Sequence, residues 1–454
     1  MDKWLAAALD YVPEWIGFQM RVSEQPGCSM AIAHKGKVVL EQAWGHADQK
    51  RGVGLTPRHR FRVASHSKSF TAAGIMKLRE KGKLQLDDPA GKYVKGLHPA
   101  VAKATVAQLL SHTAGIIRDG KDTGQWTHRR PFLSAKEVLK ELAEPQPIDA
   151  NLRMKYSNHG FGLAGLVIEA VTGEAYNTWI KREVVDAAGL DETRPDVPSP
   201  KGGPLAKGHS SKVPLGRRVI LPGDTTTHGL ASATGFISTA HDLALFFGQL
   251  SPGAKKSILS VASRREMTRR HWKVPHSQIE RWYGLGTISG SLAGWDHVGH
   301  SGGFPGFITR TATIPAHDLT ISVLTNAADG WAHQWLDGTM HILRRFHQHG
   351  APARRIADWT GRWWSLWGCF DLVPMGERVM AATPGLLDPF MDASEITVGS
   401  RDKGRVTEAC GFASYGEEVR LIRKRGKVAE VYATGSTLKS EAEAAKEAVG
   451  RYER

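Results

Sequence analysis

Cysteine is scarce in this chain of 454 residues, which has only Cys28, Cys369 and Cys410. An odd number at wide spacing is more typical of reduced thiols than of a disulfide framework. The chain also lacks an apolar run long enough to cross a membrane. The apolar stretch at residues 5–9 is too short for the core of a signal peptide, and charged residues and a proline follow it. We therefore expect a cytoplasmic protein with no membrane partner.

Acidic residues are outnumbered, with 45 Asp and Glu against 60 Lys and Arg, which gives a formal net charge of +15. The basic residues are spread along the chain, and the densest groups, Arg264–Arg270 and Arg344–Arg345, lie on segments expected to be helical, where they are typical of solvated faces. No helix-turn-helix, zinc or aromatic RNA-binding pattern accompanies them. We therefore expect no nucleic-acid partner. The charge is compatible with steering of acidic substrates and equally with solubility.

Metal-binding and low-complexity patterns are absent too. There is no His-Glu-x-x-His sequence, and His347 and His349 lie at a basic helix end, where they complement the helix dipole. No disordered tract or internal repeat stands out. The sequence therefore predicts neither a metal nor a cofactor.

The composition that is present, 41% hydrophobic and 23% charged, is typical of a globular protein. The length exceeds one ordinary core, so two domains are expected. The segment Gly350-Ala351-Pro352-Ala353 marks a break. We place the domains at residues 1–350 and 351–454.

Ser65-His66-Ser67-Lys68 is the most informative motif. Apolar residues at roughly helical spacing follow it, and the run closes at Gly82, a residue type favoured just past a helix end. Ser65 and Lys68 then share one helix face. A Ser hydroxyl is a poor nucleophile near neutral pH, but a neutral Lys beside it can take its proton. The same spacing also occurs at Ser436 to Lys439, so this motif alone does not decide the function.

Two later motifs, Tyr156-Ser157-Asn158 and His300-Ser301-Gly302-Gly303, follow in the chain. In this order and at these separations, the three motifs resemble those of the penicillin-recognising serine hydrolases. That family includes class C β-lactamases, D-alanyl-D-alanine carboxypeptidases, D-aminopeptidases and related esterases. The resemblance spans about residues 28–350, and the segments on either side of the nucleophile, residues 61–64 and 82–89, are similar to the family as well.

A further family-like segment is Leu109-Leu110-Ser111-His112-Thr113-Ala114-Gly115. We interpret it as a helix end with Gly115 as the stop, in which Ser111 and His112 make local hydrogen bonds. A direct catalytic role for these two residues is the alternative.

Two hairpins are predicted from the strand pattern. The first joins residues 29–33 to 38–43, and the second joins residues 307–314 to 319–325 across a turn that begins with Pro315. Mostly helical segments lie between them, and residues 331–345 look helical. We expect an α+β fold, with an antiparallel sheet flanked by helices, a helical lobe, and the motifs where the two meet.

The C-terminal part has short strands punctuated by glycine up to Gly435 and a charged helix over residues 440–452. The start of this part resembles the lipocalin-like barrels of some D-aminopeptidases. We expect a small all-β barrel. Trp363, Trp364 and Trp367 either pack in its core, which we favour, or line a ligand cavity.

The resemblance implies roles for the motif residues. Ser65 attacks a carbonyl and forms an acyl-enzyme, while Lys68 and Tyr156 share the proton transfers. We expect nearby positive charge to push Tyr156 towards phenolate, so that it acts as a base. Asn158 would orient Lys68 and the substrate amide. The backbone amides of Ser65 and Gly303 would form the oxyanion hole, where a glycine at 303 permits close approach.

In the third motif, His300, Ser301 and Gly302 replace the Lys-Thr-Gly of β-lactamases as the implied substrate-binding residues. His is shorter than Lys and titrates near neutrality, so the fixed positive charge that meets a penicillin carboxylate is missing. This form is similar to that of D-aminopeptidases and D-amino-acid amidases. His297-Val298-Gly299 also matches the pattern, but His297 would face the opposite side of a strand from His300.

Gly299-His300-Ser301-Gly302-Gly303 also fits the Gly-x-Ser-x-Gly nucleophile elbow. That elbow must open a helix, whereas a strand pattern follows here. We therefore predict a serine hydrolase that acts as an amidase or peptidase on small D-amino-acid amides or short peptides. One alternative is a carboxylesterase, which would use the same acyl-serine mechanism. The other is a non-catalytic binding protein built on the same scaffold. Oligomeric state cannot be predicted.

Overall fold

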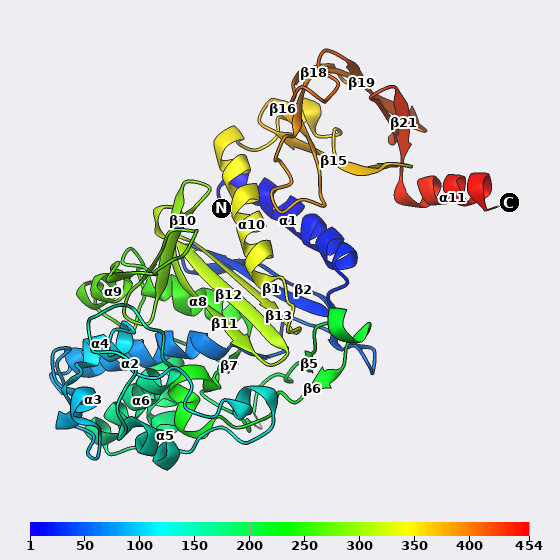
Figure 1. The fold of residues 1–454 in the computed structure, drawn as a ribbon. Helices are drawn as coiled ribbons and strands as arrows, with labels where there is room; N and C mark the ends of the chain where they lie inside the picture. Colours follow the sequence, from blue (N-terminus) through cyan, green and yellow to red (C-terminus); the bar gives the residue numbers. More distant parts are fainter. Residues whose placement is uncertain (200, 454) are drawn as a thin grey trace. The chain divides into compact units, whose positions relative to one another are not determined.

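The computed structural model describes residues 1–199 and 201–453. It divides into two compact units, one formed by Gln25–Leu336 and the other by Met1–Glu24 together with Asp337–Arg454. We call them the larger and the smaller unit and describe each by itself (Figure 1). The predicted boundary at residue 350 stays a prediction.

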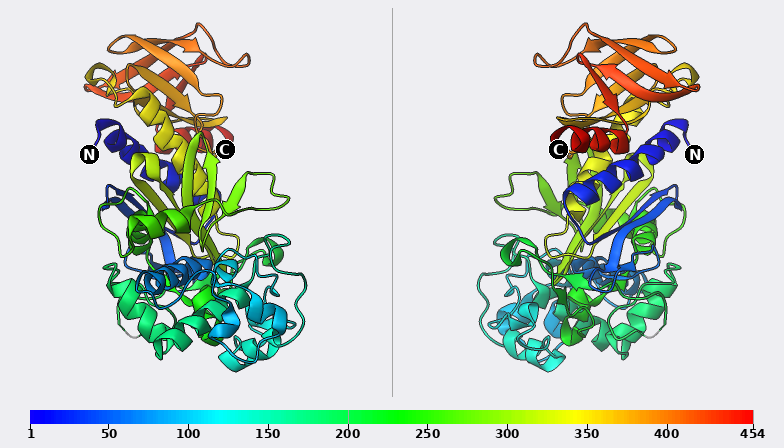
Figure 2. Two further views of the ribbon diagram at one scale, coloured as in Figure 1. Left: turned by 90° about the vertical axis from the view of Figure 1, so that its left-hand side faces the viewer. Right: turned by 90° about the vertical axis from the view of Figure 1, so that its right-hand side faces the viewer.

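The larger unit is built on a nine-stranded antiparallel sheet, visible from two sides in Figure 2. Its strand order is β3-β2-β1-β13-β12-β11-β10-β9-β8. The strands are β1 (Gly27–His34), β2 (Lys37–Asp48), β3 (Val53–Gly54), β8 (Trp272–Lys273), β9 (Arg281–Tyr283), β10 (Ile288–Leu292), β11 (Trp295–Phe304), β12 (Phe307–Ile314) and β13 (Leu319–Thr325).

Both predicted hairpins are present in this sheet. β1 and β2 are joined by Lys35 and Gly36, whose φ angles of 52° and 76° allow the tight turn that matches strand twist. β12 and β13 have the predicted bounds, and Pro315 begins the short 3₁₀ turn between them. The prediction of an antiparallel sheet with flanking helices is confirmed.

Helices cover the sheet and form a separate lobe (Figure 1). α8 (Ala240–Leu250) packs on β1, β12 and β13 through buried residues that include Leu243, Phe246 and Phe247. The remaining helices of the lobe and the sheet edge are α2 (Ser67–Glu80), α3 (Pro99–Lys103), α4 (Val106–Leu110), α5 (Ala135–Leu142), α6 (Asn158–Thr172), α7 (Tyr176–Ile180) and α9 (Val261–Thr268).

A small strand pair brings two distant segments together beside the start of α2. β4 (Phe61–Arg62) pairs with β7 (Ile237–Ser238), and the Val63 amide donates to the Phe236 carbonyl at 3.0 Å. The chain therefore enters α2 alongside the π-helical turn η7 (Ala231–Gly235). A second pair joins β5 (Gly208–His209) to β6 (Ile220–Leu221).

The smaller unit contains a closed eight-stranded barrel, as predicted for the C-terminal part. Its strands are β14 (Gly361–Ser365), β15 (Gly368–Met375), β16 (Arg378–Ala382), β17 (Ser394–Ser400), β18 (Lys403–Glu408), β19 (Glu418–Lys424), β20 (Lys427–Ala433) and β21 (Ser436–Lys439). Trp363 belongs to the hydrophobic cluster inside this unit, whereas Trp367 is 98% exposed. The prediction that these tryptophans pack in the barrel core is therefore confirmed for Trp363 and wrong for Trp367.

Helices accompany the barrel. They are α1 (Lys3–Val22), the part of α10 (Ala332–His349) that belongs to this unit, and α11 (Glu441–Tyr452). α1 was not predicted. Its Trp15 donates to the Leu386 carbonyl at 3.2 Å, and its Gln19 donates to the Pro384 carbonyl at 2.7 Å. The indole lies so close to Gly338 that a Cβ there would come within 2.2 Å of it.

We expect Trp15→Ala to lower the free energy of unfolding by about 3–5 kcal/mol, because it empties a fully buried site and removes the hydrogen bond to the Leu386 carbonyl. Trp367→Ala is the matched control and should change it by less than about 0.5 kcal/mol, since that side chain is in solvent. Denaturant titration of the full chain measures both. Equal stability of the two variants would contradict this account of α1.

Expectations from the sequence also concern the cysteines and membrane-spanning segments. Cys28, Cys369 and Cys410 are all free thiols in the structure. Of the helices in the described residues, none combines the length and the apolar character needed to span a bilayer.

Candidate functional site

Ser65 lies in a 3₁₀ turn, η1 (Ala64–His66), directly before α2 rather than within it. The preceding Ala64 has a φ of 46°, a left-handed conformation that residues other than glycine rarely adopt. Ser65 Oγ lies 3.1 Å from Lys68 Nζ and accepts a hydrogen bond from Tyr156 Oη at 2.8 Å. The structure thus brings the predicted serine, lysine and tyrosine onto one hydroxyl.

Lys68 is completely buried. Its Nζ also faces Asn158 Oδ1 at 2.6 Å and the Ala233 carbonyl oxygen at 2.8 Å. Burial lowers the pKa of Lys68 well below its usual value, and Asp119 offsets only part of this. Lys68 is thereby suited to be a neutral amine, which can accept a proton.

Tyr156 differs from the sequence expectation. We expected positive charge to lower its pKa, but burial raises the pKa of Tyr156 above its usual value, and the Ser65 hydrogen bond and Arg118 only partly oppose this. The physical reason is that burial penalises the phenolate and leaves the nearby lysine without a fixed charge. Tyr156 is therefore a protonated phenol that donates to Ser65.

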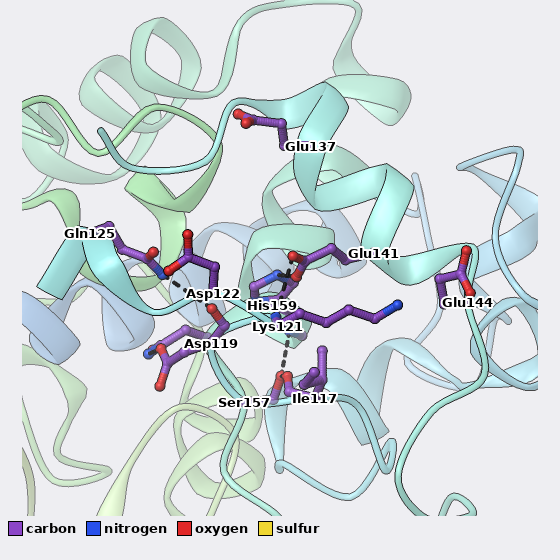
Figure 3. A network of polar contacts seen from close by, with 12 residues as sticks. Ile117, Asp119, Lys121, Asp122, Gln125, Glu137, Glu141, Glu144, Ser157 and His159 are labelled. Atoms are coloured by element: carbon purple, nitrogen blue, oxygen red, sulfur yellow. Dashed lines mark hydrogen bonds and ion pairs between the residues drawn. The ribbon is translucent and has the colours of Figure 1, made fainter. Parts of the chain in front are cut away.

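Asn158 is the first residue of α6, behind the N-cap Ser157, whose hydroxyl accepts from the Gly160 amide at 2.8 Å. Its Nδ2 donates to Asp119 Oδ1 at 2.5 Å. Figure 3 shows Asp119 in the network that joins residues 117–125 to the start of α6. There the Ser157 hydroxyl donates to the Ile117 carbonyl, and His159 meets Glu141 at 2.8 Å.

His300 lies on β11, and its Nε2 is 2.9 Å from Tyr283 Oη. Burial lowers the pKa of His300 well below its usual value, and His66 and Lys68 lower it further. The imidazole is therefore neutral and supplies no fixed positive charge. Ser301 pairs with Arg310 across the sheet, and because side chains alternate along a strand, it faces away from His300.

The glycines of the third motif have different physical roles. A Cβ on Gly302 would lie 2.2 Å from the Val63 carbonyl oxygen, so glycine is needed there for β11 to approach the segment before Ser65. A Cβ on Gly303 would meet only Ile308 at an ordinary 3.7 Å. Within the protein, the close contact is therefore at Gly302, and the close approach of a substrate to the Gly303 backbone stays a prediction.

The amide of Gly303 can still face the site. Phe304 and Phe307 pair across a two-residue connection, which makes them a hydrogen-bonded pair. Since the bonds alternate along an antiparallel ladder, the Gly303 N–H points away from β12. β10 pairs with β11 only up to Gly299, so that edge of the strand is open at residue 303.

The remaining alternatives for the third motif can be placed as well. His297 pairs with Gly290 and lies three residues from His300, on the opposite face of β11. Ser301 is inside a strand that continues to Phe304, so no helix opens after it as a nucleophile elbow requires. Among the residues that the structure describes, no group of three or more His, Cys, Asp or Glu side chains could hold a metal ion.

Comparison with known proteins identifies the family. A family model described as Beta-lactamase matches residues 18–335. The chain belongs to the beta-lactamase family. This confirms the family suggested by the three motifs.

Curated family relatives match over a limited region. Protein flp of Staphylococcus aureus is 30% identical over an alignment of 170 positions that covers 34% of this chain and 33% of that protein. The putative penicillin-binding protein PbpX of Bacillus subtilis is 30% identical over 159 residues, 35% of this chain and 39% of that one. The match thus spans about a third of the length of these relatives.

Solved structures of the beta-lactamase fold match more of the chain. The octameric penicillin-binding protein homologue from Pyrococcus abyssi has a TM-score of 0.67 at 24% identity and covers 94% of this chain and 99% of its own. A D-stereospecific amidohydrolase from Streptomyces has a TM-score of 0.58 at 25% identity, over 71% and 96%. D-amino acid amidase from Ochrobactrum anthropi has a TM-score of 0.64 at 21% identity, over 74% and 99%.

The segment at residues 109–115 of this beta-lactamase family member departs from its expected role. α4 ends at Leu110, and Gly115 lies in the following loop, where a Cβ would come within 2.1 Å of the Ile148 carbonyl. Ser111 does bond locally, to the Ala107 carbonyl at 2.8 Å. His112 instead accepts from the distant Ser157 amide at 3.1 Å, and its ring centroid lies 4.1 Å from that of Tyr156. The prediction of local bonding is therefore wrong for the His112 side chain, although its backbone amide donates to the Leu109 carbonyl at 3.4 Å.

Three groups at the site were not predicted from the sequence. They are the Asp119 carboxylate, the Tyr283 hydroxyl and the Ala233 carbonyl. Asp119 follows Gly115 by only four residues, and this proximity to a family-like segment is the one clue to it. Tyr283 and Ala233 lie in segments without a motif, and only tertiary structure brings them here.

Proposed function

We propose that the chain is a serine hydrolase that forms an acyl-enzyme on Ser65 and cleaves D-amino-acid amides or short peptides. The observation that carries the proposal is the position of Ser65 Oγ between an amine and a phenol, 3.1 Å from Lys68 Nζ and 2.8 Å from Tyr156 Oη. The serine nucleophile needs a base to take its proton, and the amine that leaves the substrate needs an acid to protonate it.

In the proposed acylation, neutral Lys68 takes the Ser65 proton as Oγ bonds to the carbonyl carbon. The backbone amides of Ser65 and Gly303 stabilise the resulting oxyanion. When the carbon–nitrogen bond breaks, Tyr156 gives its proton to the leaving amine, and the Lys68 ammonium returns a proton to Tyr156. Water then cleaves the acyl-enzyme by the reverse set of transfers.

The substrate class rests on two observations. The neutral, buried His300 stands where β-lactamases have a lysine, which disfavours recognition of a β-lactam carboxylate. Similar folds include a D-stereospecific amidohydrolase and a D-amino acid amidase. A carboxylesterase is the second candidate, because an acyl-serine site cleaves esters more readily than amides. A non-catalytic binding role is disfavoured by the intact Ser65, Lys68 and Tyr156 arrangement.

Intact-mass detection of a fluorophosphonate adduct, followed by a hydrolysis panel, tests the proposal. The panel contains D- and L-amino-acid amides, short esters and β-lactams. We expect one adduct per chain and higher kcat/KM for D-amino-acid amides than for their L-isomers. Failure of the chain to form an adduct would refute the acyl-serine mechanism, and esters cleaved with no amide turnover would favour the esterase.

We further expect wild type to cleave amides or short esters with higher kcat/KM than nitrocefin, and His300→Lys to shift preference towards carboxylate-bearing substrates. One charge-assisted contact contributes about 1.5–3 kcal/mol, which is roughly 10- to 100-fold in affinity. His297→Lys, on the opposite face of β11, is the matched control and should leave the preference unchanged. Penicillin hydrolysis faster than that of every amide and ester would overturn this substrate class.

A further inference from the structure

The Asn158 amide has a defined orientation between two partners. Asn158 Nδ2 lies 2.5 Å from Asp119 Oδ1, and Asn158 Oδ1 lies 2.6 Å from Lys68 Nζ. An ionised carboxylate only accepts hydrogen bonds, so the end of the amide facing Asp119 must be the NH₂. The carbonyl end is therefore held towards Lys68.

This orientation decides where the electron pair of a neutral Lys68 points. A neutral amine has two N–H groups and one electron pair. The carbonyl oxygens of Asn158 and Ala233 accept the two N–H groups, at 2.6 Å and 2.8 Å. The electron pair is left for the third neighbour, the Ser65 hydroxyl at 3.1 Å. If the amide were reversed, its NH₂ would donate to that electron pair and Ser65 would lose its base.

We propose that Asp119 is a positioning residue that fixes the direction of the hydrogen bonds from Asn158 through Lys68 to Ser65. It acts through Asn158 and does not contact the reacting atoms. The inference rests on the proposed function, because it concerns the base that activates Ser65.

Asp119 is itself held rigidly. Its side chain is buried, Oδ1 also accepts from Trp126 Nε1 at 3.1 Å, and Oδ2 lies 3.4 Å from Arg118 Nε. Gln125 Nε2 donates to its backbone carbonyl at 3.1 Å (Figure 3). Both carboxylate oxygens thus face donors from the protein.

The loop that carries Asp119 is fastened to the start of α6. The Asn158 amide donates to the Arg118 carbonyl at 2.8 Å, and the Ser157 hydroxyl donates to the Ile117 carbonyl at 2.6 Å. These two hydrogen bonds fix the position of the Asp119 carboxylate relative to the Asn158 side-chain amide, as a positioning role requires.

The charges around Lys68 provide a readout that a purely structural role would not change. Asp119 raises the pKa of Lys68 and Arg118 lowers it, while Tyr156, His300 and His112 are held neutral by burial. Acylation needs neutral Lys68, so it is lost as the pH falls through the pKa of that lysine. Removing the Asp119 charge lowers this pKa further and moves the acid limb to lower pH.

The test measures, over a pH series, the rate at which a fluorophosphonate probe phosphonylates Ser65 in the full chain. In this reaction Oγ gives up its proton, bonds to phosphorus and displaces fluoride, so it needs the same base as acylation. We expect Asp119→Ala to slow this phosphonylation by roughly 10- to 100-fold, the effect of losing one hydrogen bond to a charged group. Asp119→Asn should slow it less, because its carbonyl can still accept from Asn158. Both variants should shift the acid limb to lower pH. Asp122→Asn removes an exposed charge from the same loop and should react with the probe at the wild-type rate.

A double-mutant cycle shows whether Asp119 acts through Asn158. In an Asn158→Ala background, Asp119→Ala should change the rate by less than about threefold, because effects on one pathway are not additive. A wild-type rate of phosphonylation in Asp119→Ala, or an equal loss of rate in both backgrounds, would overturn the inference. If Asp119→Ala does not fold, the rate and acid limb of Asp119→Asn decide it. A wild type that forms no Ser65 adduct would instead refute the proposed function and, with it, this inference.

Discussion

Ser65→Ala should form no fluorophosphonate adduct and lose turnover by about 10⁶-fold, the effect of removing the nucleophile from a hydrolase of this kind. The reason is local, because Ser65 Oγ is the hydroxyl that meets both Lys68 Nζ and Tyr156 Oη. An alanine leaves these groups in place but gives them no oxygen to activate. Intact mass after probe treatment and turnover of the best amide in the panel measure the two losses.

Ser301→Ala is the informative comparison for this experiment. Ser301 is the serine of the Gly-x-Ser-x-Gly sequence, yet it lies within β11 and faces away from His300. We expect this variant to keep the adduct. Labelling that survives Ser65→Ala and disappears in Ser301→Ala would reverse the assignment of the nucleophile.

Local spacing explains why much of this site could be predicted from the sequence. Ser65 and Lys68 are three residues apart at the start of a helix, so their contact follows from helical geometry. The hairpin of β12 and β13 was predicted with its observed bounds because alternating strands flank a proline turn. Both features depend on residues that are close together in the sequence, and this is why they could be predicted from it.

Long-range contacts explain what could not be predicted. Asp119 reaches Asn158 across 39 residues, and Ala233 reaches Lys68 across 165. The predicted direction of the Tyr156 pKa shift was wrong for a related reason, because it too depends on the folded chain. Sequence shows the charged neighbours of a tyrosine, but the degree of burial, which is the larger effect here, depends on the folded chain.

The protonated state of Tyr156 leads to a prediction that separates an acid from a base. Tyr156→Phe should lower amide turnover by about 10²- to 10⁴-fold, the usual contribution of a positioned acid or base. An amine must be protonated to leave, and the phenol is the donor at 2.8 Å from Ser65 Oγ. A p-nitrophenyl ester releases a stable anion that needs no proton, so its turnover should fall far less.

The pH dependence follows from the same two groups. Burial lowers the pKa of Lys68 and raises that of Tyr156, so the wild type should lose activity as the pH falls through the first and as it rises through the second. Between them, the amine is neutral and the phenol protonated. Tyr156→Phe should therefore keep the acid limb and lose the alkaline one.

Tyr176→Phe is the matched control, because Tyr176 is a buried tyrosine whose hydroxyl lies 2.7 Å from Thr71 Oγ1 and not at Ser65. It should keep the wild-type ratio of amide to ester turnover. If Tyr156→Phe slowed the ester as much as the amide, Tyr156 would be acting on the Ser65 proton as a base. Lys68 would then be the group that supports it, because both substrates need Ser65 deprotonated and only the amide needs a protonated leaving group.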